Sequence, residues 1–92
     1  MRRDEAETVA LKALGWIVGA EDQRDGFLAV SGLAPEDLMR RAGEPEVLLA
    51  VMDFVLAEDR RVVAFCDAAG LRYDTLATIR AALPGGEEAH WT

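Results

Sequence analysis

The sequence has little of the chemistry that most catalytic and metal sites use. It contains one cysteine, Cys66, and one histidine, His90, in 92 residues. A single cysteine excludes an intramolecular disulfide and a cage of thiolate ligands, and it is typical of a reducing compartment. A lone histidine lacks the partners that a catalytic or metal-binding imidazole needs. The sequence therefore predicts no catalytic, cofactor-binding or metal-binding residue and favours a noncatalytic role over an enzyme.

Basic residues and long apolar runs are also scarce. Lys and Arg total 10 against 17 Asp and Glu, which gives a net charge of −7. Nucleic acids and anionic membrane surfaces both require a basic face. No apolar stretch approaches the roughly 20 residues of a membrane span, and Asp4, Glu5 and Lys12 interrupt the pattern of an export signal. We therefore expect a cytoplasmic protein with no nucleic-acid or membrane partner.

What the chain does contain is enough apolar surface for one folded domain. Hydrophobic residues make up 51% of the sequence, which is typical of a globular protein and not of a disordered one. The length suits a single domain with an adequate core. We expect one helical domain over residues 1–83 and a tail over residues 84–92, because Pro84-Gly85-Gly86 ends regular structure.

Apolar residues recur every three or four positions, which is the period of helices that bury one face. Pro35 and Pro45, each followed by an acid, mark helix starts, and Gly32 and Gly70, each followed by leucine, mark helix ends. The sequence therefore predicts an all-α protein, a compact bundle of about six short helices. The predicted ranges are 4–19, 22–30, 35–42, 47–57, 59–69 and 73–83.

One motif occurs twice, 38 residues apart. Each copy reads Phe, four residues, Gly-Leu, four residues and Leu, beginning at Phe27 and at Phe65. The same shift superimposes Trp16 on Phe54. One interpretation is a duplication that produced two tandem three-helix units. The alternative is that two helix–glycine–leucine–helix joints look alike because the cap itself requires Gly-Leu.

A candidate polar seam runs along the fourth helix and beyond it. Asp53 is the only charge in the apolar run over residues 47–57, and Arg60 and Arg61 follow about two turns later. A charge in such a helix needs a partner or a route to water. The seam is either the polar edge of a buried helix or a place where a carboxylate faces a ligand.

The tail supplies the candidate partner-binding residues Pro84, His90 and Trp91. A tryptophan after Pro-Gly-Gly either folds back onto the helices or anchors a partner, since aromatic anchors dominate contact energetics.

The leading functional hypothesis is a noncatalytic protein–protein interaction module or a self-associating helical module, with a homodimer as one variant. The alternative is a small-molecule-binding or enzymatic helical domain with a pocket near Asp53 or between the two three-helix groups. DNA binding is a third and more distant hypothesis. The basic pairs Arg40-Arg41 and Arg60-Arg61 suggest it, but the acidic residues around each pair disfavour it.

The runs at residues 10–17, 26–56, 64–71 and 81–86, with a late tryptophan, resemble a family of short alphaproteobacterial proteins described only as a domain of unknown function. The resemblance covers nearly the whole chain, and residues 27–56 are its most specific part. Family members often have Asp-Pro-Glu where this chain has Arg72-Tyr73-Asp74, a departure that weakens the start signal of the last helix. The resemblance implies an all-helical cytoplasmic bacterial protein and transfers no activity.

Overall fold

The computed structural model describes residues 1–86, and that part of the chain forms six α-helices and no strand. The all-α prediction is confirmed, and every helix boundary lies within two residues of the predicted one. The helices are α1 (Arg3–Val18), α2 (Glu21–Ser31), α3 (Pro35–Arg40), α4 (Pro45–Leu56), α5 (Asp59–Ala69) and α6 (Thr75–Ala82).

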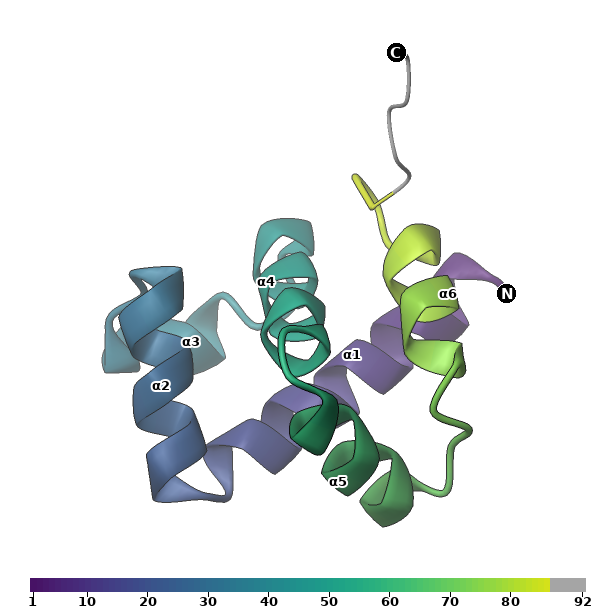
Figure 1. Cartoon of the computed structure of the whole chain (residues 1–92). Helices are drawn as coiled ribbons and strands as arrows, with labels where there is room; N and C mark the ends of the chain where they lie inside the picture. Colours follow the sequence, from purple (N-terminus) through teal and green to yellow (C-terminus); the bar gives the residue numbers. More distant parts are fainter. Residues whose placement is uncertain (87–92) are drawn as a thin grey trace, which may run out of the picture.

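The two central helices are α1 and α4, which pack against each other and against α2, α5 and α6. Figure 1 shows α1 crossing behind α4, with α2 and α3 on one side and α6 on the other. The core consists of the inward faces of these helices and includes Ile17, Phe27, Met52 and Phe65, all buried. The helices predicted as two groups of three therefore share one core.

Helix α4 is buried over most of its surface because its sequence is almost entirely apolar. Half of its residues are buried. Pro45 occupies the first turn, where its missing N–H costs nothing. Asp53 and Ala57 lie on the exposed side, as the polar side of such a helix should. The buried residues are Val47, Leu48, Val51, Met52, Phe54 and Val55.

The two glycine joints end α2 and α5 as predicted. Gly32 has φ 75° and Gly70 has φ 71°, both left-handed. The backbone N–H of Gly32 donates to the carbonyl of Leu28, and that of Gly70 donates to the carbonyl of Cys66. These bonds satisfy carbonyls that would otherwise lack a partner at the helix ends. Both helices therefore stop at the joint, and the chain turns.

Alanine at either joint is expected to destabilise the protein, because a side chain in the left-handed region meets the following carbonyl. We expect Gly32→Ala and Gly70→Ala each to lower the free energy of unfolding by about 1–2 kcal/mol. Neither position has a heavy atom within 4 Å of an added Cβ, so the cost comes from backbone strain alone. Urea unfolding followed by circular dichroism measures it, and an unchanged midpoint in both variants would contradict the left-handed assignment.

Two helices are shorter than predicted because local bonds close the neighbouring turns. Helix α3 ends at Arg40, and the N–H of Glu44 then bonds to the carbonyl of Arg41 at 3.0 Å. Helix α6 starts at Thr75, whose N–H bonds to the carbonyl of Arg72 at 3.1 Å.

The chain stays packed for three residues beyond the boundary predicted at residue 83. The N–H of Gly86 donates to the carbonyl of Leu83 at 2.8 Å, and Arg80 Nη1 donates to the carbonyl of Gly86 at 3.2 Å. Gly86 is buried, and Pro84 is half-buried. Residues 84–86 thus lie against α6 and form part of the folded body.

Candidate functional site

The structure separates the predicted site residues into three places. Asp53 lies on the exposed side of α4, Arg60 and Arg61 lie in the first turn of α5, and Pro84 follows α6. His90 and Trp91, the other two predicted partner-binding residues, lie outside the described residues.

The ion-pair partner of Asp53 is Arg80, which is not part of the candidate polar seam. Arg80 of α6 donates from Nε to Oδ1 of Asp53 at 2.5 Å and from Nη2 to Oδ2 at 3.4 Å. Helices α4 and α6 pack side by side and bring Arg80 to the carboxylate.

Arg61 is instead fixed against Phe54. Its Nη1 donates to the carbonyl of Phe54 at 2.9 Å, and its Cζ lies 3.8 Å from the centre of the Phe54 ring. It also pairs with Glu58 at 3.1 Å, and only 17% of its side chain is exposed. Three contacts hold this guanidinium in one place, and the ring contact is a cation–π interaction.

Arg60 has the opposite setting. Its side chain is 79% exposed, and its described ion pair joins Nε to Glu58 at 2.5 Å. The hydrogen bond from Arg60, helped by the charges of Arg60 and Arg61, lowers the pKa of Glu58 below its ordinary value. Glu58 is thus an ionised carboxylate that joins both arginines at the start of α5.

An open groove runs between α2 and α4, and we call it the α2/α4 groove. Its volume is about 640 Å³. Val30 lies at the groove with 72% of its surface exposed. The walls are mostly apolar, with Asp53, Glu58 and Arg61 as the charged members. The lining residues are Gly26, Phe27, Ala29, Val30, Ser31, Ala50, Asp53, Phe54, Ala57, Glu58 and Arg61.

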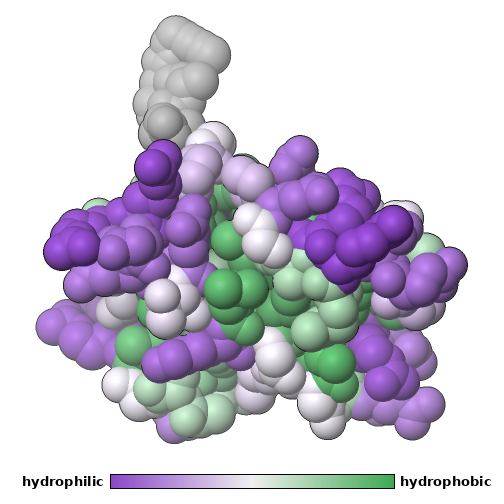
Figure 2. All heavy atoms as spheres, turned by 180° about the vertical axis from the view of Figure 1, so that it is seen from behind, coloured by the Kyte–Doolittle hydropathy of each residue, from purple (hydrophilic) through white to green (hydrophobic). Residues whose placement is uncertain are grey.

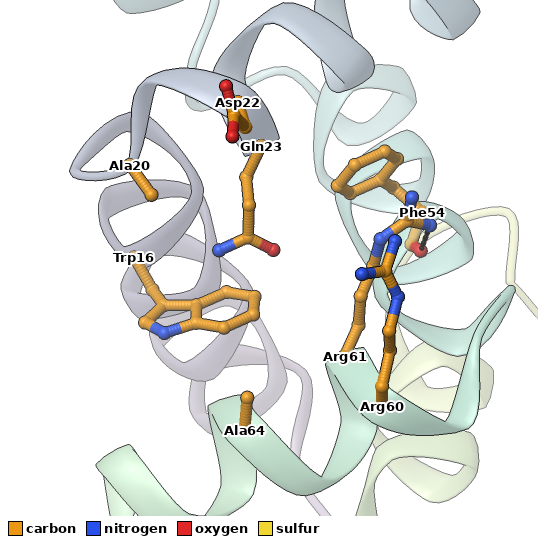
Figure 3. A pocket seen from close by; sticks show the side chains of 8 residues that line it. All are labelled: Trp16, Ala20, Asp22, Gln23, Phe54, Arg60, Arg61 and Ala64. Atoms are coloured by element: carbon orange, nitrogen blue, oxygen red, sulfur yellow. Dashed lines mark hydrogen bonds between the residues drawn. The ribbon is translucent and has the colours of Figure 1, made fainter.

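A second hollow, which we call the central cleft, opens where α1, α2, α4 and α5 meet. Its volume is about 510 Å³. Figure 3 shows Trp16 and Gln23 on one side of it, facing Phe54, Arg60 and Arg61 on the other. Phe54 and Arg61 also line the α2/α4 groove, so they form a wall shared by the two hollows. The remaining lining residues of the cleft are Ala20, Asp22 and Ala64.

Apolar side chains also gather on the opposite face of the molecule. Figure 2, which views the molecule from behind relative to Figure 1, shows them across the middle of the face, bordered by hydrophilic residues. Exposed apolar surface of this kind is common on small domains, where a single core cannot cover every apolar residue.

The sequence offered a pocket near Asp53 as one alternative, and Asp53 does line the α2/α4 groove, but the sequence could not give the other walls of the groove. Gly26 and Ala29 on α2 and Ala50 on α4 are small, and they leave the space that forms the groove. Small residues at helical spacing on both helices are the only sequence signal. That signal acquires meaning only when the helices are known to face each other.

Cys66 lies on the buried face of α5, and its Sγ is 3.6 Å from the carbonyl oxygen of Arg72. Burial, and then the nearby charge of Asp67, raises the pKa of the Cys66 thiol. A thiol in this setting is protonated at neutral pH and packs as a small apolar side chain.

The buried thiol predicts slow chemical labelling. We expect Cys66 in the native protein to react with DTNB at least about 100-fold more slowly than in urea-unfolded protein, since the reaction requires opening of the core. Absorbance of the released thionitrobenzoate measures both rates. Comparable rates would contradict the packing of α5 on the core.

Within residues 1–86 no cluster of three or more His, Cys, Asp or Glu side chains is placed to hold a metal ion. None of the helices in this part of the chain has the length and apolar character required to cross a membrane.

The comparisons with known proteins give one match, to a protein family. No curated protein and no solved structure matches the chain. Residues 3–86, nearly the whole of the described part, match the family DUF3572, whose description is "protein of unknown function". The chain belongs to this family of unknown function, DUF3572.

Proposed function

We propose that this protein is a noncatalytic interaction module whose α2/α4 groove binds an amphipathic helix from a different protein, with basic residues on the polar side of that helix. The observation that carries the proposal is an apolar groove of about 640 Å³ with Val30 72% exposed beside it. We further propose that it acts in the cytoplasm, in line with its single unbridged cysteine.

The size and lining of the groove suit a helix. The groove is open and has a volume of about 640 Å³, so apolar side chains of an incoming helix can enter it. Gly26, Ala29 and Ala50 are small, so a third helix can approach α2 and α4 closely. Recognition of this type places apolar anchors of the incoming helix, three or four residues apart, into the groove.

The charge of the chain favours a basic partner over a second copy. The net charge is −7, so two copies repel each other while a basic helix is attracted. Among the charged side chains lining the groove, Asp53 and Glu58 outnumber Arg61. The attraction is long-range, so binding should weaken as salt is added.

The ionisable groups of the groove are structural in their present setting, which supports a noncatalytic role. Asp53 is paired with Arg80, and Glu58 is paired with Arg60 and Arg61. A general acid or base needs a proton that can be exchanged near neutral pH. The hydrogen bond from Arg60 lowers the pKa of Glu58, so this carboxylate stays ionised near neutral pH and acts as a fixed charge.

A displayed library of amphipathic helices of about 16–20 residues tests the proposal, because a helix of this length presents roughly four to five turns of apolar anchors. We expect enrichment of peptides with apolar anchors and a basic polar face. Peptides selected from the library should bind the Val30→Gln variant about tenfold more weakly than the wild-type protein, since the substitution removes the apolar contact that Val30 offers.

Met39→Gln is the matched control, because Met39 is 70% exposed on α3 and lines neither hollow. Its binding should equal that of the wild type. Equal binding to both variants, or no enrichment at all, would refute the groove as the site. A dimer in sedimentation velocity that Val30→Gln dissolves would instead place a second copy there and reject a different partner.

A further inference from the structure

The central cleft lies where the two halves of the chain meet, and each half contributes corresponding positions to it. A shift of 38 residues superimposes Trp16 on Phe54, Asp22 on Arg60 and Gln23 on Arg61. All six of these residues line the cleft. Corresponding residues that face one another across a shared hollow indicate an approximate two-fold relation between the α1–α2 and α4–α5 pairs.

Two aromatic contacts support the same relation independently. The ring of Trp16 lies 5.6 Å from that of Phe65, and the ring of Phe27 lies 5.6 Å from that of Phe54. The 38-residue shift exchanges these pairs, because it takes Trp16 to Phe54 and Phe27 to Phe65. Each half therefore packs its long helix against the short helix of the other half.

The apolar walls of the cleft are alike, but its polar ends differ. The α5 end carries two guanidinium groups, whereas the corresponding α2 positions carry a carboxylate and an amide. Within residues 1–86 the side chain of Gln23 makes no hydrogen bond and Asp22 makes no ion pair. A molecule in the cleft would therefore meet donors at one end and acceptors at the other.

Arg60 is the group best placed to hold an anion. Its side chain is 79% exposed and bonds to Glu58 at the surface. Exposed pairs of this kind contribute little, so an incoming carboxylate can replace Glu58 at small cost. Arg61, fixed on Phe54, adds positive charge beside it.

We infer that the central cleft binds a small planar organic anion with its ring against Trp16, its carboxylate on Arg60 and a hydrogen-bond donor at its far end on Asp22 or Gln23. Figure 3 places Trp16 across the cleft from Arg60 and Arg61, so a ligand whose ring lies against Trp16 can turn a carboxylate towards the arginines. The cleft volume of about 510 Å³ suits a molecule of this class. The inference does not rest on the helix-binding role of the α2/α4 groove, although Phe54 and Arg61 line both hollows.

The test uses para-hydroxybenzoate as the ligand and the full chain with the substitution Trp91→Phe. The chain has two tryptophans, so this substitution leaves Trp16 as the single source of an indole signal. The indole N–H signal of Trp16 in a two-dimensional NMR spectrum reports binding. We expect it to shift and saturate below about 10 mM ligand, a range reasonable for a molecule of this size. The neutral analogue para-hydroxybenzamide should bind about tenfold more weakly, because it lacks the charge.

Two sets of variants identify the ends of the ligand. Arg60→Gln should weaken the binding of para-hydroxybenzoate about tenfold. The control Arg40→Gln alters a similarly exposed arginine on α3 and should leave that binding unchanged. The hydroxyl group should make para-hydroxybenzoate bind the wild-type cleft more tightly than benzoate. In the double variant Asp22→Ala, Gln23→Ala the two ligands should bind with equal affinity.

Three results would overturn the inference. They are an indole signal that does not move, equal binding of the acid and the amide, and equal effects of Arg60→Gln and Arg40→Gln. Persistence of the hydroxyl's advantage in the double variant would contradict the assigned orientation.

Discussion

Replacing Phe65 with alanine is expected to lower the free energy of unfolding by about 3–5 kcal/mol. The ring is buried on α5 and packs against Trp16 at 5.6 Å. Removing it takes apolar surface out of the core and leaves a cavity between α5 and its neighbours. A domain of this size has only about 5–15 kcal/mol of stability in total, so the variant should be largely unfolded under mild denaturing conditions.

Val63→Ala is the matched control, because Val63 lies on the same helix and is exposed. It should change the free energy of unfolding by no more than about 0.5–1 kcal/mol. Urea unfolding monitored by circular dichroism gives both values. If Phe65→Ala lowers the free energy of unfolding by less than about 1.5 kcal/mol, the ring is not packed as described, since replacing a buried phenylalanine with alanine costs more than this.

Gly86→Ala is expected to destabilise the protein by about 2–3 kcal/mol, although it adds a single methyl group. A Cβ at this position would lie 1.9 Å from the carbonyl oxygen of Arg80 and 3.1 Å from that of Leu83. Both are backbone atoms, so no side-chain rotation relieves the overlap. The chain would have to move away and lose the hydrogen bonds that Gly86 makes to Leu83 and Arg80.

Gly15→Ala provides a control of opposite sign. Gly15 lies inside α1, and nothing lies within 4 Å of an added Cβ. Alanine there should raise the free energy of unfolding by about 0.5–1 kcal/mol, because glycine is unfavourable within a helix. If Gly86→Ala were as stable as the wild type, residues 84–86 would not be part of the packed body.

The helices could be predicted because their signals are local. Gly32 and Gly70 end α2 and α5 through bonds to residues four positions earlier. Pro35 and Pro45 are the first residues of α3 and α4. Such signals depend on neighbours in sequence, so they can be read without knowing the fold. The late start of α6 is harder to predict from the sequence, because Tyr73 bonds to Asp67 on the preceding helix.

The candidate sites could not be predicted in the same way. The pair between Asp53 and Arg80 joins residues 27 positions apart, and only the packing of α4 on α6 brings them together. Likewise, Val30 belongs to an apolar helix face by its spacing, yet it is among the most exposed apolar residues. The reason is that α4 covers Phe27 and leaves the next turn of α2 open at the groove.

An amide NMR titration of the full chain with a selected basic helix tests the proposed function most directly. The account predicts that the amides of Gly26, Ala29, Val30 and Ala57 shift and saturate together. It also predicts that the fitted Kd rises with added salt. Shifts confined to α3 and α6, or a Kd that does not depend on salt, would contradict binding between α2 and α4 driven by the acidic charge of the chain.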